Sequence, residues 1–201
     1  MRFISYYTTG GKYETAAQKL AESARRVGLD HGVRLYALPE LPEWKDNIFR
    51  KARVIRGAMD EFPGEDIVWI DADAWFASHP TLFFKISQDS PAFFAAYIEL
   101  PQNLYGGVKW FRASADSRLI VDRWIEQNEK TPQYVDDNNL LFVLKGYKPG
   151  KIYYLPPAYC WTEAWFRRRF PGAKPVIYHD MIVTAGNWAQ RSDVTTRGGN
   201  P

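Results

Sequence analysis

The sequence has almost no cysteine, no long apolar run and no large excess of charge, and each absence excludes a class of protein. Cys160 is the single cysteine among 201 residues, so the chain cannot form an internal disulfide. No apolar run approaches the roughly 20 residues of a membrane-spanning helix. The net charge of +3 and the pI near 8.9 suit anionic ligands but fall short of a dedicated nucleic-acid-binding protein.

The first residues turn polar too early for a secretory signal peptide, and the sequence has no internal repeat. Without a membrane span, these features predict a cytoplasmic protein. We expect one domain, which covers residues 1–190. Residues 191–201 are rich in Gly, Thr and Arg and have no core-forming pattern, so we expect them to be a flexible tail.

Aromatic residues, by contrast, are abundant: eight Trp, twelve Tyr and twelve Phe make up 16% of the chain. Such rings line binding sites for sugars and bases as well as cores. Hydrophobic residues at 46% and charged residues at 24% are typical of a globular domain.

Segments that favour strands alternate with segments that favour helices. The first strand–helix–strand unit has a short return, which predicts a parallel pair joined by a right-handed crossover. We therefore expect an α/β, Rossmann-like domain with a mixed, mostly parallel sheet flanked by helices. Ser114 and Asp136 are expected to cap two of the helices. The expected strands are 3–7, 33–38, 67–70, 92–97, 108–112, 152–155 and 176–179, and the expected helices are 13–27, 47–62, 116–128 and 136–146, with a short helical turn at 82–84.

The stretch from Ile67 to Phe76 carries the strongest functional signal. Its first four residues predict a strand buried on both faces, and Asp71 and Asp73 follow this strand at once. Alternate spacing through Ala72 lets both carboxylates converge on one hard cation at the carboxyl end of the strand, where open α/β sheets bind ligands. The competing interpretation is that Asp71 begins a turn and Asp73 caps a short helix. The buried strand before them favours the metal site.

Taken in order, these features resemble the GT-A fold of nucleotide-diphospho-sugar glycosyltransferases, in particular the small retaining members related to glycogenin and the galactosyltransferases. The resemblance covers residues 3–188. It rests on a first strand that ends in Tyr6-Tyr7-Thr8, on Asp71-Ala72-Asp73, on Gly106-Gly107-Val108 before a strand, on Asp136-Asp137 at a helix start, and on a late His179.

The resemblance implies a role for each of these residues. Asp71 would contact the ribose and the metal, Asp73 would bind the metal directly, and His179 would be a third metal ligand. The other implied positions are Tyr6, Tyr7 and Thr8 at the base and ribose, Lys51 or Arg50 near the nucleotide, Gly106 and Gly107 at the donor, and Asp136, then Asp137, as catalytic residues near the transferred sugar or the acceptor.

The chain departs from the family pattern at two places. Tyr105-Gly106-Gly107 stands where the pattern has Asn-Ser-Gly, so the resemblance does not carry over the side-chain contacts to the donor sugar that the family makes there. Asp137 stands where the pattern has Gln, which leaves the catalytic assignment open between Asp136 and Asp137.

The predicted function is metal-dependent transfer of a hexosyl or pentosyl group from a nucleoside-diphosphate sugar to an acceptor hydroxyl. An imidazole beside two carboxylates suits Mn²⁺ somewhat better than Mg²⁺. The acceptor is a saccharide or another hydroxyl compound. Arginines 167–169 lie among aromatic residues, and they form either a solvated basic strip or a contact with the acceptor. Basic residues among aromatic rings would suit a nucleic acid, so a modified nucleobase in DNA is the less favoured alternative acceptor.

Two alternatives remain at this point. A nucleotidyltransferase would use the same metal and nucleotide, but residues 8–12 only faintly resemble its Gly-rich phosphate loop. A non-catalytic sugar- or nucleotide-binding module would be favoured by loss of the metal carboxylates, and both are present.

Overall fold

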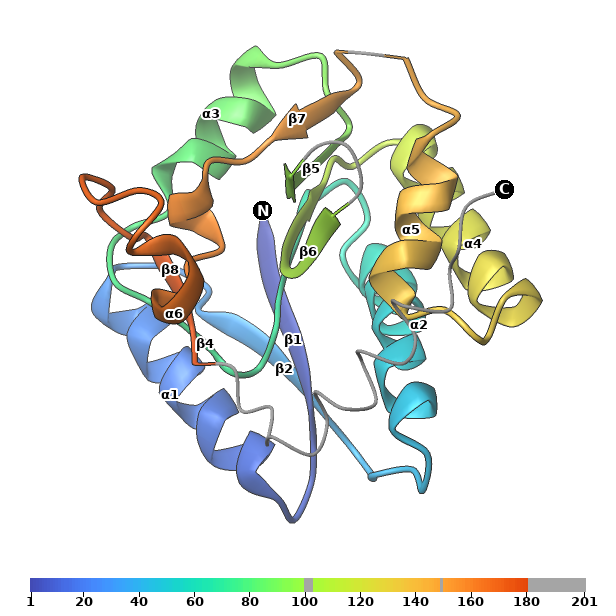
Figure 1. Cartoon of the computed structure of the whole chain (residues 1–201), viewed down its shortest axis with the longest axis horizontal. Coiled ribbons are helices and arrows are strands. Elements are labelled where there is room, and N and C mark those ends of the chain that lie inside the picture. Colours follow the sequence, from blue (N-terminus) through green and yellow to red (C-terminus); the bar gives the residue numbers. More distant parts are fainter. Residues whose placement is uncertain (100–102, 149, 181–201) are drawn as a thin grey trace.

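The computed structural model describes residues 1–99, 103–148 and 150–180, and these form an α/β domain (Figure 1). The predicted tail at 191–201 and the end of the predicted domain lie outside the described residues. The strands are β1 (Arg2–Thr8), β2 (Val33–Leu38), β3 (Ile67–Ile70), β4 (Ala74–Phe76), β5 (Phe94–Glu99), β6 (Asn103–Phe111), β7 (Ile152–Tyr154) and β8 (Ile177–His179). The helices are α1 (Lys12–Arg26), α2 (Trp44–Glu61), α3 (Thr81–Asp89), α4 (Ala115–Lys130), α5 (Asp136–Leu144), α6 (Glu163–Phe166) and the 3-10 helix η1 (Pro157–Tyr159).

The main sheet is mixed, with the order β2-β1-β3-β6-β5-β7. β1 runs parallel to β2 and β3, and β5 runs parallel to β7, whereas β6 is antiparallel to both of its neighbours. The predicted parallel pair of β1 and β2 is therefore confirmed. β4 and β8 form a separate antiparallel pair.

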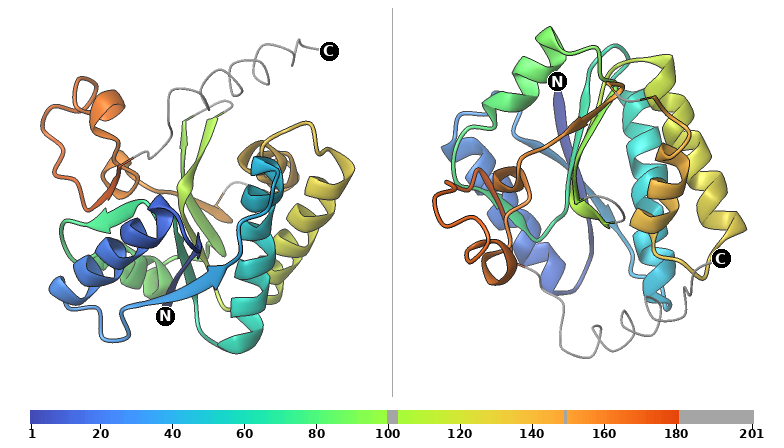
Figure 2. Two further views of the ribbon diagram at one scale, coloured as in Figure 1. Left: turned by 90° about the horizontal axis from the view of Figure 1, so that it is seen from below. Right: turned by 45° about the horizontal axis from the view of Figure 1, so that its top comes forward.

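Helices cover both faces of the main sheet, as two views at different angles show (Figure 2). On one face, α1 and α3 contribute Leu20 and Phe83 to a core that also contains β4 and β8 residues. On the other face, α2, α4 and α5 contribute Ile55, Trp124 and Leu140 to a second core. β3 is buried along its whole length between these two cores, as its apolar sequence predicts.

Three sequence predictions about local structure are wrong. The helix after Pro80 is longer than the turn predicted at 82–84, because proline precedes the first helical residue and interrupts no helical hydrogen bond. The competing interpretation of Asp73 as a helix cap is also excluded, since the chain enters β4 instead. Asp136 is the first residue of α5 rather than its cap, and Val135 takes the cap position. Gly106 and Gly107 lie inside β6, not at its entry.

The prediction for Ser114 is confirmed, because its side chain accepts a hydrogen bond from the Ser117 N–H at 3.2 Å, at the start of α4.

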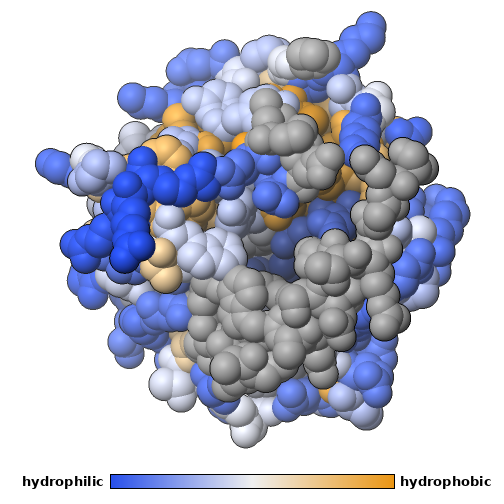
Figure 3. Space-filling view, in the orientation of Figure 1, coloured by the Kyte–Doolittle hydropathy of each residue, from blue (hydrophilic) through white to orange (hydrophobic). Residues whose placement is uncertain are grey.

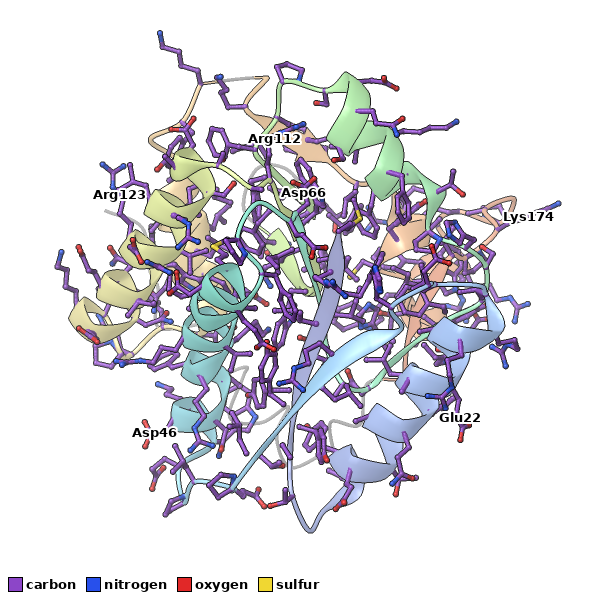
Figure 4. All side chains as sticks on the ribbon, turned by 180° about the vertical axis from the view of Figure 1, so that it is seen from behind. Glu22, Asp46, Asp66, Arg112, Arg123 and Lys174 are labelled. Atoms are coloured by element: carbon purple, nitrogen blue, oxygen red, sulfur yellow. The ribbon has the colours of Figure 1, made fainter. Side chains whose placement is uncertain are left out.

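Most charged side chains lie at the surface, and hydrophilic residues predominate among the coloured atoms on the face that Figure 3 shows. The labelled exposed residues in Figure 4, Glu22, Asp46, Arg123 and Lys174, are of this kind. Arg112 is different, because its guanidinium donates to the carbonyl oxygens of residues 86, 87, 90 and 92. It thereby ties the end of α3 to the sheet.

Candidate active site

The chain turns sharply where β3 ends, and this turn assembles one edge of the site. The Asp71 N–H donates to the Gly107 carbonyl at 2.9 Å, and the Ala74 N–H donates to the Asp71 carbonyl at 3.0 Å. β4 then pairs with β8 so that Ala74 lies opposite His179, and the Asp180 N–H donates to the Asp73 carbonyl at 2.9 Å. Asp71, Asp73 and His179 thus reach the same end of the sheet from segments about 100 residues apart in sequence.

The Asp71 carboxylate has two polar partners. Its Oδ1 atom accepts a hydrogen bond from Trp69 Nε1 at 2.6 Å and lies 3.3 Å from the Lys51 ammonium. Burial by itself would raise the pKa of Asp71, but the positive charges of Lys51 and Lys109 outweigh it and the pKa is lowered. Asp71 is therefore ionised at neutral pH.

Lys51, on α2, is a buried ammonium that lies between two carboxylates. It is 3.2 Å from Asp136 Oδ2 as well as 3.3 Å from Asp71 Oδ1, and its side chain is 9% exposed. Burial would lower the pKa of Lys51, but the surrounding carboxylates, Asp136 first, raise it well above its usual value. Lys51 is therefore a fixed positive charge beside Asp71.

Tyr6 closes this group from β1. Its hydroxyl donates to the Asn47 carbonyl at 2.5 Å, and its ring centroid lies 5.7 Å from that of Trp69. Burial raises the pKa of Tyr6, so the hydroxyl stays protonated and acts as a donor.

The two aspartates at the start of α5 have different environments. Asp136 is buried, and burial, together with the neighbouring charge of Asp137, raises its pKa to about 6. Its Oδ2 atom accepts no hydrogen bond from a described residue, although Lys51 is close. The Asp137 side chain is 22% exposed, so it is the one that solvent or a ligand can reach.

Asp137 pairs with Lys109, a residue that the sequence analysis did not single out. Lys109 Nζ donates to Asp137 Oδ1 at 3.0 Å and also to the Gly106 carbonyl. A Cβ atom at position 106 would lie 1.9 Å from Asp137 Oδ2, so the carboxylate occupies space that any side chain there would need. The visible signal in the sequence was a lone lysine between Val108 and Trp110-Phe111 in a strand.

Gly107 makes the same kind of room for His179. A Cβ atom at position 107 would lie 2.3 Å from His179 Cε1. Burial lowers the pKa of His179 even though Asp73 and Asp71 act in the opposite direction. Its Nε2 atom has no hydrogen-bond partner among the described residues, which leaves a buried nitrogen available to a ligand.

The predicted metal ligands Asp71, Asp73 and His179 carry donor atoms that divalent metals accept, but their side chains are not arranged as a coordination site. Within the described ranges, no three His, Cys, Asp or Glu side chains are arranged so that they could hold a metal ion. Two carboxylates and an imidazole nitrogen without a partner nevertheless form a donor set that divalent metals accept. The metal assignment of Asp71, Asp73 and His179 therefore stays a prediction.

The remaining predicted site residues lie on β1 and α2. Thr8 is buried and Tyr7 half-buried at the end of β1, beside Tyr6. Arg50 donates to the Pro39 carbonyl, whereas among the described residues it is Lys51 that forms ion pairs with Asp71 and Asp136. Lys51 rather than Arg50 is thus the helix-borne basic residue at the site. The other two arginines of α2 form surface ion pairs, Arg53 with Glu129 and Arg56 with Asp60 and Asp122.

The segment with arginines 167–169 lies near the same end of the sheet through Tyr105. The Trp165 ring lies edge-on to Tyr105, with centroids 6.0 Å apart, and is 37% exposed. Arg167 pairs with Glu163 at 2.5 Å, and Arg169 pairs with Glu99. Two of the three arginines are therefore already neutralised by acidic neighbours.

Comparisons with known proteins identify the fold. Neither a family model nor a curated protein sequence matches the chain. Among solved structures, a glycosyltransferase involved in the glycosylation of the major capsid of PBCV-1 matches with a TM-score of 0.68 and 17% identity, over 96% of this chain and 99% of that one. The chain has the GT-A glycosyltransferase fold.

Two further GT-A neighbours agree with this assignment. The glycosyltransferase GlyE of Streptococcus pneumoniae TIGR4 gives a TM-score of 0.60 with 14% identity, over 92% of this chain and 55% of that one. Mouse xyloside xylosyltransferase 1 gives 0.56 with 11% identity, over 90% and 97%. The GT-A domain has no described helix of the length and apolarity needed to cross a membrane.

Proposed function

We propose that the protein is a metal-dependent glycosyltransferase that transfers a sugar from a nucleoside-diphosphate sugar to an acceptor hydroxyl. The observation that supports the proposal is that backbone pairing brings Asp71, Asp73 and His179 to the carboxyl end of β3, within a GT-A fold. The buried Nε2 atom of His179, which has no hydrogen-bond partner among the described residues, supports it further.

In this proposal Asp71, Asp73 and His179 would hold a divalent cation, with Mn²⁺ favoured over Mg²⁺ by the imidazole ligand. When bound, the cation supplies a Lewis acid that neutralises negative charge on the departing diphosphate. The bond between the sugar C1 and the diphosphate oxygen breaks, a bond forms between C1 and the acceptor oxygen, and the proton of the acceptor hydroxyl passes to the released nucleoside diphosphate.

The chain's own residues prepare the site for this exchange. Lys51 balances the charges of Asp71 and Asp136, so the Asp71 carboxylate is kept ionised at the end of β3. The half-buried ring of Tyr6 packs against the buried ring of Trp69 beside Asp71, and we assign to Tyr6 a contact with the nucleoside. Asp137 is the partly exposed carboxylate at α5, and we assign to it the contact with hydroxyls of the transferred sugar or the acceptor.

The named neighbours differ in what they glycosylate. One is involved in the glycosylation of the major capsid of PBCV-1, and another is a xyloside xylosyltransferase. We therefore propose that the transferred group is a hexosyl or pentosyl group and that the acceptor is a hydroxyl compound. A nucleic-acid acceptor has less support, because Arg167 and Arg169 are paired with carboxylates.

The test is titration calorimetry of the purified protein with a panel of nucleoside diphosphates and their sugars, with and without Mn²⁺. We expect one nucleotide to bind only with the metal, and its sugar form to be turned over. Failure of a folded protein to bind any member of the panel would reject the proposal.

A further inference from the structure

Lys109 is unusual because a lysine side chain with none of its surface exposed lies in the middle of a sheet strand. Its strand neighbours Val108 and Trp110 are fully buried, and its ammonium lies 5.4 Å from the Trp124 ring centroid. A buried ammonium is costly unless it is paired and hydrogen-bonded. Asp137 and the Gly106 carbonyl provide those partners.

A bulge in β6 brings Gly106 into this arrangement. Ala96 of β5 pairs with Lys109 and the next residue, Tyr97, pairs with Tyr105, so the three residues between them in β6 have no partner on β5. The bulge reverses the alternation of the strand, since Tyr105 packs against one core and Phe111 against the other. Gly106 therefore faces α5, where its missing side chain leaves room for the Asp137 carboxylate.

Stability alone does not account for this pair. Replacing a buried ion pair by apolar residues of similar volume is often neutral or stabilising. An apolar residue at position 109 would suit the surrounding core, which includes Phe111 and Trp124. The pair also joins a fully buried ammonium to a carboxylate that is 22% exposed, so its outer end faces the site.

We propose that Lys109 is a positioning residue that holds the Asp137 carboxylate over Gly106 for contact with a sugar hydroxyl. Gly106, Lys109 and Asp137 then act as one unit, and position 106 is glycine because the carboxylate occupies the space of a Cβ atom. This inference rests on the proposed function.

The test is a set of double-mutant comparisons on the sugar nucleotide found in the panel. We expect Lys109→Met and Asp137→Asn each to lower kcat/KM for donor turnover by about 10- to 100-fold, because a carboxylate displaced by roughly 1 Å loses productive geometry. The double variant is expected to be no worse than Asp137→Asn alone, because both changes remove the same contact. Affinity for the nucleoside diphosphate with Mn²⁺, which lacks the sugar, should not change.

Gly106→Ala is the matched variant that leaves both charges in place. Its methyl group enters the space of the carboxylate, so we expect the same loss of turnover with the same retained nucleotide affinity. It also carries the test if Lys109→Met does not fold. Multiplicative losses in the double variant, or wild-type turnover in either single variant, would overturn the inference.

The outcome is separable from failure of the proposed function. If the wild-type protein binds and turns over no donor, the function is rejected while the unit is still tested by a crystal structure of Gly106→Ala. A displaced Asp137 carboxylate supports the unit, and an unmoved one contradicts it.

Discussion

At the scale of single residues, the site consists of oppositely charged side chains that form ion pairs and are buried or partly buried. Lys51 lies between Asp71 and Asp136, and Lys109 pairs with Asp137. Each lysine holds one carboxylate that is at least partly exposed, because the Asp71 side chain is 31% exposed and that of Asp137 is 22% exposed. The exposed ends of both pairs are therefore the groups that a ligand meets.

Asp73→Ala tests the metal assignment most directly. We expect it to abolish Mn²⁺-dependent binding of the nucleoside diphosphate, because the carboxylate that would bind the metal directly is removed, while cooperative unfolding is retained. Calorimetry and a thermal melt measure both properties. Asp180→Ala is the matched control, since it removes a neighbouring carboxylate that is 45% exposed and lies outside the donor set. Equal loss in both variants would contradict the assignment.

Asp136 gives a prediction about pH. Its pKa is about 6 in the fold against an ordinary 3.8, so its contribution to stability is fully present below pH 3.8 and is lost as the pH rises through 6. Asp136→Asn lacks this titration. We therefore expect the difference in unfolding free energy, variant minus wild type, to increase between pH 4 and 6 by on the order of 1–3 kcal/mol and to stay level above 7. Denaturant titrations at each pH measure it, and a flat difference across this range would count against the raised pKa.

At the scale of elements, the glycines divide by backbone conformation and by position. Gly57 lies exposed within α2 and has open space where a Cβ atom would be, whereas Gly28 follows α1 with a φ of +79°. Gly106 and Gly107 have neither property, because neighbouring side chains fill the space beside them. The same substitution by alanine thus has a different consequence at each kind of site.

Gly57→Ala is expected to raise the unfolding free energy by about 0.5–1 kcal/mol, because alanine loses less backbone entropy in a helix interior. Gly28→Ala makes the same chemical change where φ is positive, so it is expected to lower the unfolding free energy by about 1 kcal/mol. Denaturant unfolding of the two variants beside wild type compares them. Shifts of the same sign would show that this conformational argument fails.

The elements that were predictable from sequence are those whose signal is local. α1 and α2 were predicted from the helical periodicity of their apolar residues, and β3 was predicted from four consecutive apolar residues. β4 was missed because its three residues are a strand only through pairing with β8, about 100 residues later. The bulge at Gly106 was missed for a similar reason, since the Asp137 carboxylate that fills the space beside Gly106 comes from a distant part of the sequence.

The site was predictable to a similar degree. Asp71, Asp136 and Lys51 were singled out, with Arg50 as the alternative to Lys51, and the structure places both carboxylates against Lys51. Lys109 was overlooked because a lysine within a strand is ordinarily assigned to solvent. Only the position of α5 shows that it points into a core.

At the scale of the whole molecule, the two cores lie on opposite faces of one sheet, and both contain residues of β3 and β6. The site lies at the carboxyl end of β3, where Ile70 pairs with Val108 of the antiparallel strand β6. Cys160 belongs to the core that contains α1, α3 and β8. The residue is buried, with 4% of its surface exposed, and Asp71 and Lys109 are among the charges that act on its thiol.

Cys160 should therefore report global unfolding. Burial raises the pKa of its thiol to about 12, so the reactive thiolate is scarce even at pH 9. We expect a maleimide to leave the native protein unlabelled over hours at pH 8 and to label one site per chain once guanidinium unfolds it, as intact mass shows. The labelling midpoint in denaturant should coincide with the midpoint of the circular-dichroism transition, because the core around Cys160 opens only with the sheet. Labelling well before that transition would mean that the β8 side opens separately from the rest of the domain, and the predicted metal ligand His179 would then be mobile in the native state.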